Sequence, residues 1–288
     1  MKKSILFIFT ACFLFTTSCS DFLDEEHKTK YSSEYVFGTP EGLKLAVNAL
    51  YALQRYYAND TENATIFALE RGTDLAVTNG GTGNFYGIYD PNYLKPSASQ
   101  VGFMWRTMYQ IIGKANEIIA AAEDLEDTPS LRATVSEAKC FRAQSYFLLY
   151  RTFDRIWLNI QPTTAENVND PRDFHAASEK EVFDLIYEDL EYAITNLDWV
   201  SDEAGRFTQA AARHMKAKAA LWLKDWDTTL EQVEEIEKSG HFDLIALNEV
   251  FNAGDLNHKE ALMVQQWSKN PGGNLSNATP KGNYYAAY

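Results

Sequence analysis

Apolar side chains recur at three- and four-residue steps along most of the chain, which predicts α-helices rather than strands. The longest such pattern covers residues 101–125, and its recurring positions are Met104, Met108, Ile111, Ala115, Ile118 and Ala122. Comparable patterns predict helices over 39–57, 131–153, 178–197, 208–225 and 226–240. The fold class is therefore expected to be mainly α.

Residues at the predicted helix ends support these assignments. Thr39 is a suitable N-cap and Pro40 suits the first helical position. Ser178 and Glu181 have the spacing of a capping box, and Gly240 follows its helix as a C-terminal glycine should. Pro129 and Ser130 mark another helix start.

The last two predicted helices resemble a known repeat unit. In "ALWLKDWDTTLEQVEEI", a helix ends near Trp222, a tight turn follows at Lys224 and Asp225, and a second helix begins. This arrangement resembles a tetratricopeptide repeat, whose spacing of about 34 residues does not recur here. The sequence therefore predicts degenerate tetratricopeptide-like helical repeats that stack into a superhelix.

The first residues have the organisation of a lipoprotein signal. Lys2 and Lys3 precede an apolar stretch, and the small residues Thr17 and Ser18 precede Cys19. We expect residues 1–18 to be removed and Cys19 to carry the lipid. An ordinary signal peptide with an incidental cysteine is the alternative, and Cys12 is a less suitable lipid acceptor because it lies inside the apolar stretch.

Irregular stretches interrupt the helical pattern. Residues 73–99 are rich in Gly, Asn, Tyr and Pro, and a loop of this length is usually functional or disordered. A second linker covers 155–174, and after Gly240 the helical pattern fades into a strand-like run at 259–264 and then a loop. The expected organisation is a signal peptide (1–18), an acidic tether and lead-in segment (19–38), a helical-repeat domain (39–260) with the inserted loop 73–99, and the start of an incomplete C-terminal ligand-binding region (261–288).

The charge balance excludes two classes of partner. The chain has 40 Asp and Glu against 26 Lys and Arg, and a formal net charge of −14. Such an acidic chain is not expected to bind nucleic acid or to adhere by charge to an acidic membrane surface. Aromatic residues reach 14%, which exceeds what an acidic helical scaffold requires, so some rings are expected to face a ligand.

The sequence offers no recognisable catalytic constellation. It lacks the metalloprotease, serine-hydrolase, phosphate-loop and dinucleotide-binding motifs, and its five histidines are scattered. Once residues 1–18 are removed and Cys19 is acylated, Cys140 is the one remaining thiol and is expected to be a small buried apolar residue. His214 is expected to be a packed histidine, and the acidic runs 188–191 and 231–237 to be solvated helix faces. We therefore expect no enzyme activity, no metal site and no cofactor.

Several motifs, in this order, resemble the SusD/RagB family of surface lipoproteins of Bacteroidetes. The stretches are "CSDFLDEE", "MWRTMYQIIGKANEII", "EAKCFRAQSYFLLYRTF", "GRFTQAAARHMKAKAALWLKDW" and "SGHFDL". The most specific matches are Trp105, Tyr109, Ile112, Ala115 and Asn116 in one motif, and Glu137, Ala138, Arg142, Ala143, Tyr146 and Phe147 in the next. One departure follows, since Asp154 and Trp157 replace the Gly and Pro of the family's F-G-x-[VI]-P-L turn.

The resemblance implies a SusD-like superhelical domain and a non-catalytic, glycan-binding lipoprotein. Such a protein faces the exterior of the outer membrane, is anchored by its lipid, and delivers nutrients to a SusC-type TonB-dependent transporter. The acidic residues directly after Cys19 fit the export signal of surface lipoproteins. A peptide-binding uptake lipoprotein on the same scaffold and a helical-repeat adaptor without a small ligand are the alternatives.

Proteins bind sugars with aromatic rings, which stack on the C–H faces, and with polar groups, which bond the hydroxyls. The loop 73–99 contains both kinds of side chain and is the expected ligand-binding segment. The candidate ligand-binding residues are Asp74, Asn84, Phe85, Tyr86, Tyr89, Tyr93 and, from the C-terminal region, Trp267. The alternative is that these rings only attach the loop to the helices. Core or helix-packing roles are expected for Trp105, Trp157, Trp222 and Trp226.

Overall fold

The computed structural model describes residues 31–59, 99–171, 174–250 and 257–264, and within these ranges the regular elements are α-helices. The helices are α2 (Ser33–Gly38), α3 (Pro40–Asn59), α5 (Ser99–Ala122), α6 (Pro129–Thr152), α7 (Glu179–Asn196), α8 (Gln209–Leu223), α9 (Trp226–Lys238) and α10 (Leu247–Val250). The mainly helical fold is therefore confirmed.

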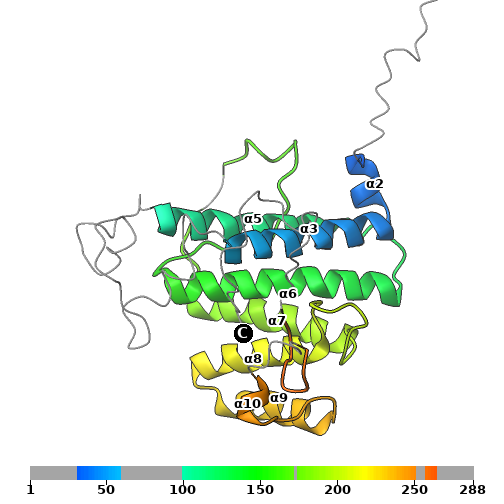
Figure 1. Cartoon of the computed structure of the whole chain (residues 1–288). Helices are drawn as coiled ribbons and strands as arrows, with labels where there is room; N and C mark the ends of the chain where they lie inside the picture. Colours follow the sequence, from blue (N-terminus) through cyan, green and yellow to red (C-terminus); the bar gives the residue numbers. More distant parts are fainter. Residues whose placement is uncertain (1–30, 60–98, 172–173, 251–256, 265–288) are drawn as a thin grey trace, which may run out of the picture.

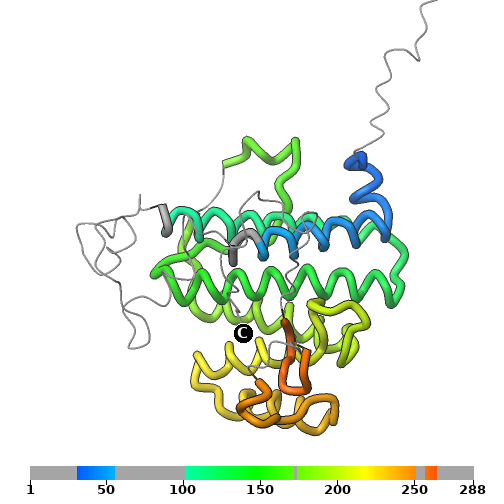
Figure 2. The backbone as a smooth tube through the Cα atoms, in the orientation of Figure 1, coloured from blue at the N-terminus to red at the C-terminus, as the bar shows by residue number. Residues whose placement is uncertain are grey.

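The long helices stack in chain order. Each of α5, α6, α7, α8 and α9 packs against the helix before it, and α3 packs against both α5 and α6 (Figure 1). Figure 2 follows the same progression from blue α3 in the upper part of the stack to gold α9 at its bottom. This arrangement of neighbouring helices is that of a tetratricopeptide-like stack.

The predicted helix ends are confirmed. The Thr39 hydroxyl accepts a hydrogen bond from the Gly42 N–H at 3.0 Å, and Pro40 begins α3. At the start of α7, the Ser178 hydroxyl accepts from the Glu181 N–H at 3.3 Å, while the Glu181 carboxylate accepts from the Ser178 N–H at 2.8 Å. Gly240, just after α9, has the positive φ of 70° that favours glycine.

Two short helices were not predicted from the sequence. α2 lies in the stretch read as a lead-in segment, and it begins where the Ser32 hydroxyl accepts from the Tyr35 N–H at 3.1 Å. α10 lies where the helical pattern fades. Both are too short to generate a periodic apolar pattern. The run at 259–264 is not a strand in the part described here, where Val264 forms an isolated bridge.

The core contains the apolar positions that the periodicity indicated. Leu43, Val47 and Leu50 of α3 are buried. The recurring positions of α5 join them in the same cluster or pack against it, as do Val182, Ile186 and Leu190 of α7 and Ala212 of α8. Cys140 of α6 is buried there as a free thiol. Since these positions come from every long helix before α9, the apolar core runs through the stack.

Two expectations about side-chain exposure were wrong. Asp189, in the acidic run 188–191, is fully buried because Lys139 and Arg142 of α6 neutralise its charge. Trp226, also expected to pack, is 58% exposed. Trp222 is 48% exposed, but its ring meets Phe147 of α6 edge-on at 6.4 Å between centroids, which agrees with a helix-packing role. Trp105 and Trp157 are half-buried, as expected of packing residues, and Trp105 contacts the core.

Two tyrosine hydroxyls hold the linker after α6. The Tyr109 hydroxyl accepts from the Trp157 N–H at 3.0 Å and donates to the Trp157 carbonyl at 2.8 Å. The Tyr146 hydroxyl does the same for Asn159, at 2.7 Å and 2.8 Å. Each hydroxyl thus satisfies both backbone groups of one residue, as a neighbouring strand would. This is how the chain is fixed where Asp154 and Trp157 replace the family's Gly and Pro.

No helix among the described residues combines the length and the apolar composition that crossing a bilayer requires.

Candidate ligand-binding site

The predicted ligand-binding residues lie outside the described ranges. This holds for Asp74, Asn84, Phe85, Tyr86, Tyr89, Tyr93 and Trp267, and also for the predicted lipid-bearing Cys19. Their roles stay predictions. The structure does describe α3, which ends at Asn59 before the loop 73–99, and α5, which begins at Ser99 where the loop ends. These two helices pack against each other.

A cleft of about 260 Å³ opens beside the C-terminal half of α3. Its walls come from α3, from the turn at 203–206 before α8, and from one residue of the last described segment. The lining residues are Asn48, Tyr51, Ala52, Gln54, Arg55, Glu203, Ala204, Gly205, Arg206 and Met263. Because α3 leads into the segment that contains the loop 73–99, the cleft lies on the helix from which that segment departs.

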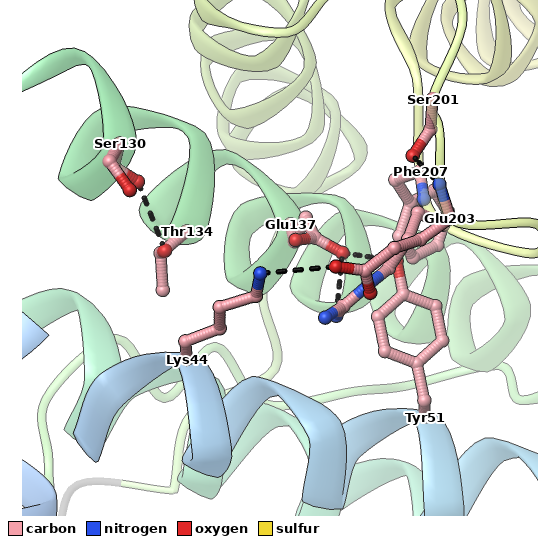
Figure 3. Close-up of polar contacts among 9 residues, drawn as sticks. Lys44, Tyr51, Ser130, Thr134, Glu137, Ser201, Glu203 and Phe207 are labelled. Atoms are coloured by element: carbon pink, nitrogen blue, oxygen red, sulfur yellow. Dashed lines mark hydrogen bonds and ion pairs between the residues drawn. The ribbon is translucent and has the colours of Figure 1, made fainter. Parts of the chain in front are cut away.

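The floor of the cleft is a polar network between α3, α6 and the turn (Figure 3). The Tyr51 hydroxyl donates to the Glu137 carboxylate and accepts from the Phe207 N–H at 2.7 Å. Arg206 donates to the same Glu137 oxygen at 3.3 Å and to Glu203 at 3.0 Å. The Tyr51 ring also lies under the Arg206 guanidinium, at 5.0 Å from its centroid. The network therefore fixes the turn against the helices.

Lys44 extends this network to the surface. Its Nζ lies 3.1 Å from Glu203 Oε1, and both side chains are more than half exposed (Figure 3). An ion pair in such a position contributes little to stability, so its role is to limit where Glu203 can lie.

Burial changes the ionisation of the buried members. It raises the pKa of Glu137, while the hydrogen bond from Tyr51 and the charge of Arg206 act in the opposite direction. Burial, together with the neighbouring Glu137 charge, raises the pKa of Tyr51 well above its usual value. Tyr51 is therefore a neutral hydrogen-bond donor at physiological pH.

The chemistry of the cleft is suited to binding. Asn48 and Arg55 line it and bring an amide and a guanidinium group to its wall. Gln54 is already bonded to Gln144 at 2.8 Å. Within the described ranges, no group of three or more His, Cys, Asp or Glu side chains is placed to hold a metal ion. Amide and guanidinium donors beside a tyrosine ring suit a polyhydroxylated ligand.

Sequence reasoning missed this cleft. One signal was present, because Asn48, Ala52 and Arg55 recur at helical steps along α3 and form a face that contains no large apolar residue. The other wall comes from residues about 150 positions later, and no local pattern connects the two.

Most of the quoted motif residues have structural roles. Arg142 donates to Asn116 Oδ1 at 2.9 Å and to Asp189, and Asn116 donates to the Asn159 carbonyl at 2.7 Å. Tyr109 and Tyr146 hold the linker after α6. These residues join α5, α6, α7 and the linker. The motifs are therefore a signature of the helical scaffold and not of a ligand-binding site.

The chain matches a protein-family model over residues 21–221, and the family is described as SusD-like, starch-binding and associating with the outer membrane. A SusD-like protein of Bacteroides ovatus is 25% identical over 93% of this chain and 50% of the relative. A SusD-like protein of Formosa agariphila, P25, is 24% identical over 95% of this chain and 53% of the relative. The chain thus spans about half the length of the curated relatives that it matches.

Solved structures share the fold. A laminarin-binding SusD-like protein superposes with a TM-score of 0.69 and 23% identity, over 78% of this chain and 50% of the other. A crystal structure with a xylogluco-oligosaccharide superposes with a TM-score of 0.64 and 21% identity, over 78% and 46%.

Proposed function

This chain belongs to the SusD-like family, and from that membership we propose that it binds glycans at the cell surface without acting on them chemically. The observation that carries the proposal is the family match over residues 21–221, which includes every long helix from α3 to most of α8. Relatives with the same fold include a laminarin-binding protein and a protein crystallised with a xylogluco-oligosaccharide.

The glycan surface that we propose combines the loop 73–99 with the cleft on α3. Phe85, Tyr86, Tyr89 and Tyr93 would stack on the apolar faces of sugar rings, and Asp74 and Asn84 would bond their hydroxyls. Asn48 and Arg55 would extend the hydroxyl contacts into the cleft, which is supported by their place in its lining. Trp267 is a further candidate ring.

The same membership supports a location and a partner. We propose that Cys19 carries the lipid, that the protein is anchored to the outer membrane facing the exterior, and that it passes glycans to a SusC-type TonB-dependent transporter. The order of Lys2, Lys3, an apolar stretch and Cys19 is the support for the lipid anchor. Metabolic labelling with a fatty acid should mark the wild type and not Cys19→Ala, and persistent labelling of that variant would contradict the anchor.

A glycan array tests the binding function directly. The mature chain should retain neutral oligosaccharides with dissociation constants in the range of roughly micromolar to millimolar, since stacking buries little area and hydroxyl bonds replace bonds to water. Tyr86→Ala, Tyr89→Ala and Arg55→Ala should each weaken retention, whereas Tyr31→Ala, at an exposed position beside α2, should not. Helical circular dichroism of each variant is the folding control.

The alternatives give different results in the same experiment. Retention of peptides instead of sugars would replace the glycan proposal with peptide uptake. If neither is retained by a folded chain, an adaptor without a small ligand is the better description. If glycans bind and the tyrosine variants bind equally well, the function stands and the loop is not its site.

A further inference from the structure

Five aromatic rings form a continuous series of contacts from the end of α6 to the surface. Phe153 meets Trp105 edge-on at 5.0 Å, and Trp105 lies 4.8 Å from Tyr109, both between ring centroids. The rings of Tyr109 and Trp157 are stacked, with their centroids 6.4 Å apart, and the centroids of Trp157 and Phe174 are 4.9 Å apart. The first four rings are half-buried, while Phe174 is 70% exposed. The series therefore ends in a ring that faces water.

The outer rings are held on an ordered backbone. Both backbone groups of Trp157 are bonded to the Tyr109 hydroxyl. The preceding residue, Ile156, is buried, and its carbonyl accepts from the Ala177 N–H at 2.9 Å. That bond brings the chain shortly after Phe174 against the chain shortly before Trp157. The backbone of Trp157 is thus fixed before a ligand binds, so that little of its conformational freedom is lost on binding, and the Trp157 ring supports the exposed Phe174 ring.

Two charged side chains lie close to Trp157 in the sequence. Asp154 and Arg155 are three and two residues before it, and their side chains are 95% and 81% exposed. Their charged groups are 3.6 Å apart, which is a loose, solvated pair. A sugar ring is bound by flat apolar rings, on which its C–H face stacks, together with charged or polar groups that bond its hydroxyls, and this short linker carries both kinds of side chain.

We propose that Trp157 and Phe174 form an aromatic platform on which a pyranose ring of a neutral glycan stacks, with Asp154 and Arg155 bonding its hydroxyls. The platform rests on the proposed glycan-binding function and adds a subsite made of other residues than the cleft and the loop 73–99. Trp105 and Tyr109 belong to the first turns of α5, which begins at Ser99, where the loop ends. The platform contacts the N-terminal half of α5 through Tyr109, so it would lengthen the glycan surface along the helix that follows the loop.

If the platform lengthens the glycan surface, affinity should depend on the length of the ligand. A short oligosaccharide fills either the loop and cleft or the platform, so the platform should add little to its affinity. A longer one can occupy both subsites at once and should bind more tightly, because its second contact is made within a complex that has already formed. The test is an array of neutral oligosaccharides that includes laminarin and xyloglucan fragments of increasing length. Wild type, Phe174→Ala, Phe174→Tyr and Phe174→Leu are compared on it, with Trp226→Ala as the matched control at a similarly exposed ring on α9.

Phe174→Ala and Phe174→Leu should weaken binding of the longer fragments about 3- to 10-fold, the range expected for one aromatic stacking contact. Phe174→Tyr, which keeps a flat ring, should bind as the wild type does, and Trp226→Ala should change nothing. Equal binding of long fragments by wild type, Phe174→Ala and Phe174→Leu would overturn the platform and leave the glycan-binding function intact. If the wild type binds no glycan on the array, both proposals fail.

Discussion

Arg142 of α6 and Asp189 of α7 form a buried two-point ion pair, with Nε 2.7 Å from Oδ2 and Nη2 2.7 Å from Oδ1. Lys139 adds a third bond to Oδ1 at 2.8 Å. Arg142 also donates to Asn116 of α5 at 2.9 Å. Because Asp189 is fully buried, this cluster is a polar connection inside the apolar core that α5, α6 and α7 share.

Asp189→Ala should lower the free energy of unfolding by about 3–5 kcal/mol, because it leaves Lys139 and Arg142 as buried cations without their carboxylate. Urea unfolding measures this loss. Asp184→Ala is the matched control, since Asp184 lies on the same helix in an exposed pair with Lys180 and should cost about 0.5 kcal/mol or less. Equal losses for the two variants would show that the buried cluster is not a stabilising connection.

Tyr146→Phe should cost about 1–3 kcal/mol, because it removes the hydroxyl that satisfies both the N–H and the carbonyl of Asn159. Tyr150→Phe is the comparison within the same helix. Its hydroxyl donates at 2.7 Å to Glu179 in an exposed position, and its loss should cost about 0.5 kcal/mol or less. Thermal or urea unfolding decides between them, and a Tyr146→Phe variant as stable as Tyr150→Phe would contradict the role of the hydroxyl.

The contribution of Glu137 should depend on pH. Burial raises its pKa in the folded chain above the usual 4.5, so the folded state keeps its proton to higher pH than the unfolded state. Stability should therefore fall as pH rises from about 4.5 through the folded pKa, and should stay lower above it. Glu137→Gln has no proton to lose at this position and should lack that decrease.

Urea unfolding of the wild type and Glu137→Gln at a series of pH values isolates this effect. The stability of the wild type relative to the variant should be greatest at the acidic end and should decline toward neutral pH. A difference that is constant across the series would mean that the pKa of Glu137 is the same in the folded and unfolded chains.

Gly42→Ala should disturb the junction between α2 and α3. A Cβ at this position would lie 2.6 Å from the Val36 carbonyl oxygen and 2.7 Å from the Val36 Cα, and backbone atoms cannot move aside as a flexible side chain can. We expect a loss of about 1–3 kcal/mol. Gly113→Ala, in the middle of α5 with no atom within 4 Å of the new Cβ, should instead stabilise by about 0.5–1 kcal/mol. Melting temperatures that shift in the same direction would contradict the steric argument.

The sequence by itself determined the elements that depend on local patterns. The apolar periodicity located every long helix in the part of the chain that the structure describes, and Thr39, Ser178, Glu181 and Gly240 marked ends that the structure confirms. Short segments such as α2 and α10 escaped because four to six residues cannot show a helical period. The family motifs were recognised from their spacing, which reflects packing positions on neighbouring helices.

Only the tertiary structure decided which polar residues are buried and which surfaces meet. From the sequence, Asp189 was expected to lie on a solvated helix face with the other acids of 188–191. It is buried because α6 brings Lys139 and Arg142 to it. The cleft on α3 needs Glu203 and Arg206 from far along the chain. Trp157 meets Phe174 because Tyr109 holds the linker backbone. In each case the partner is distant in sequence, and burial and pairing depend on three-dimensional proximity that a local pattern does not encode.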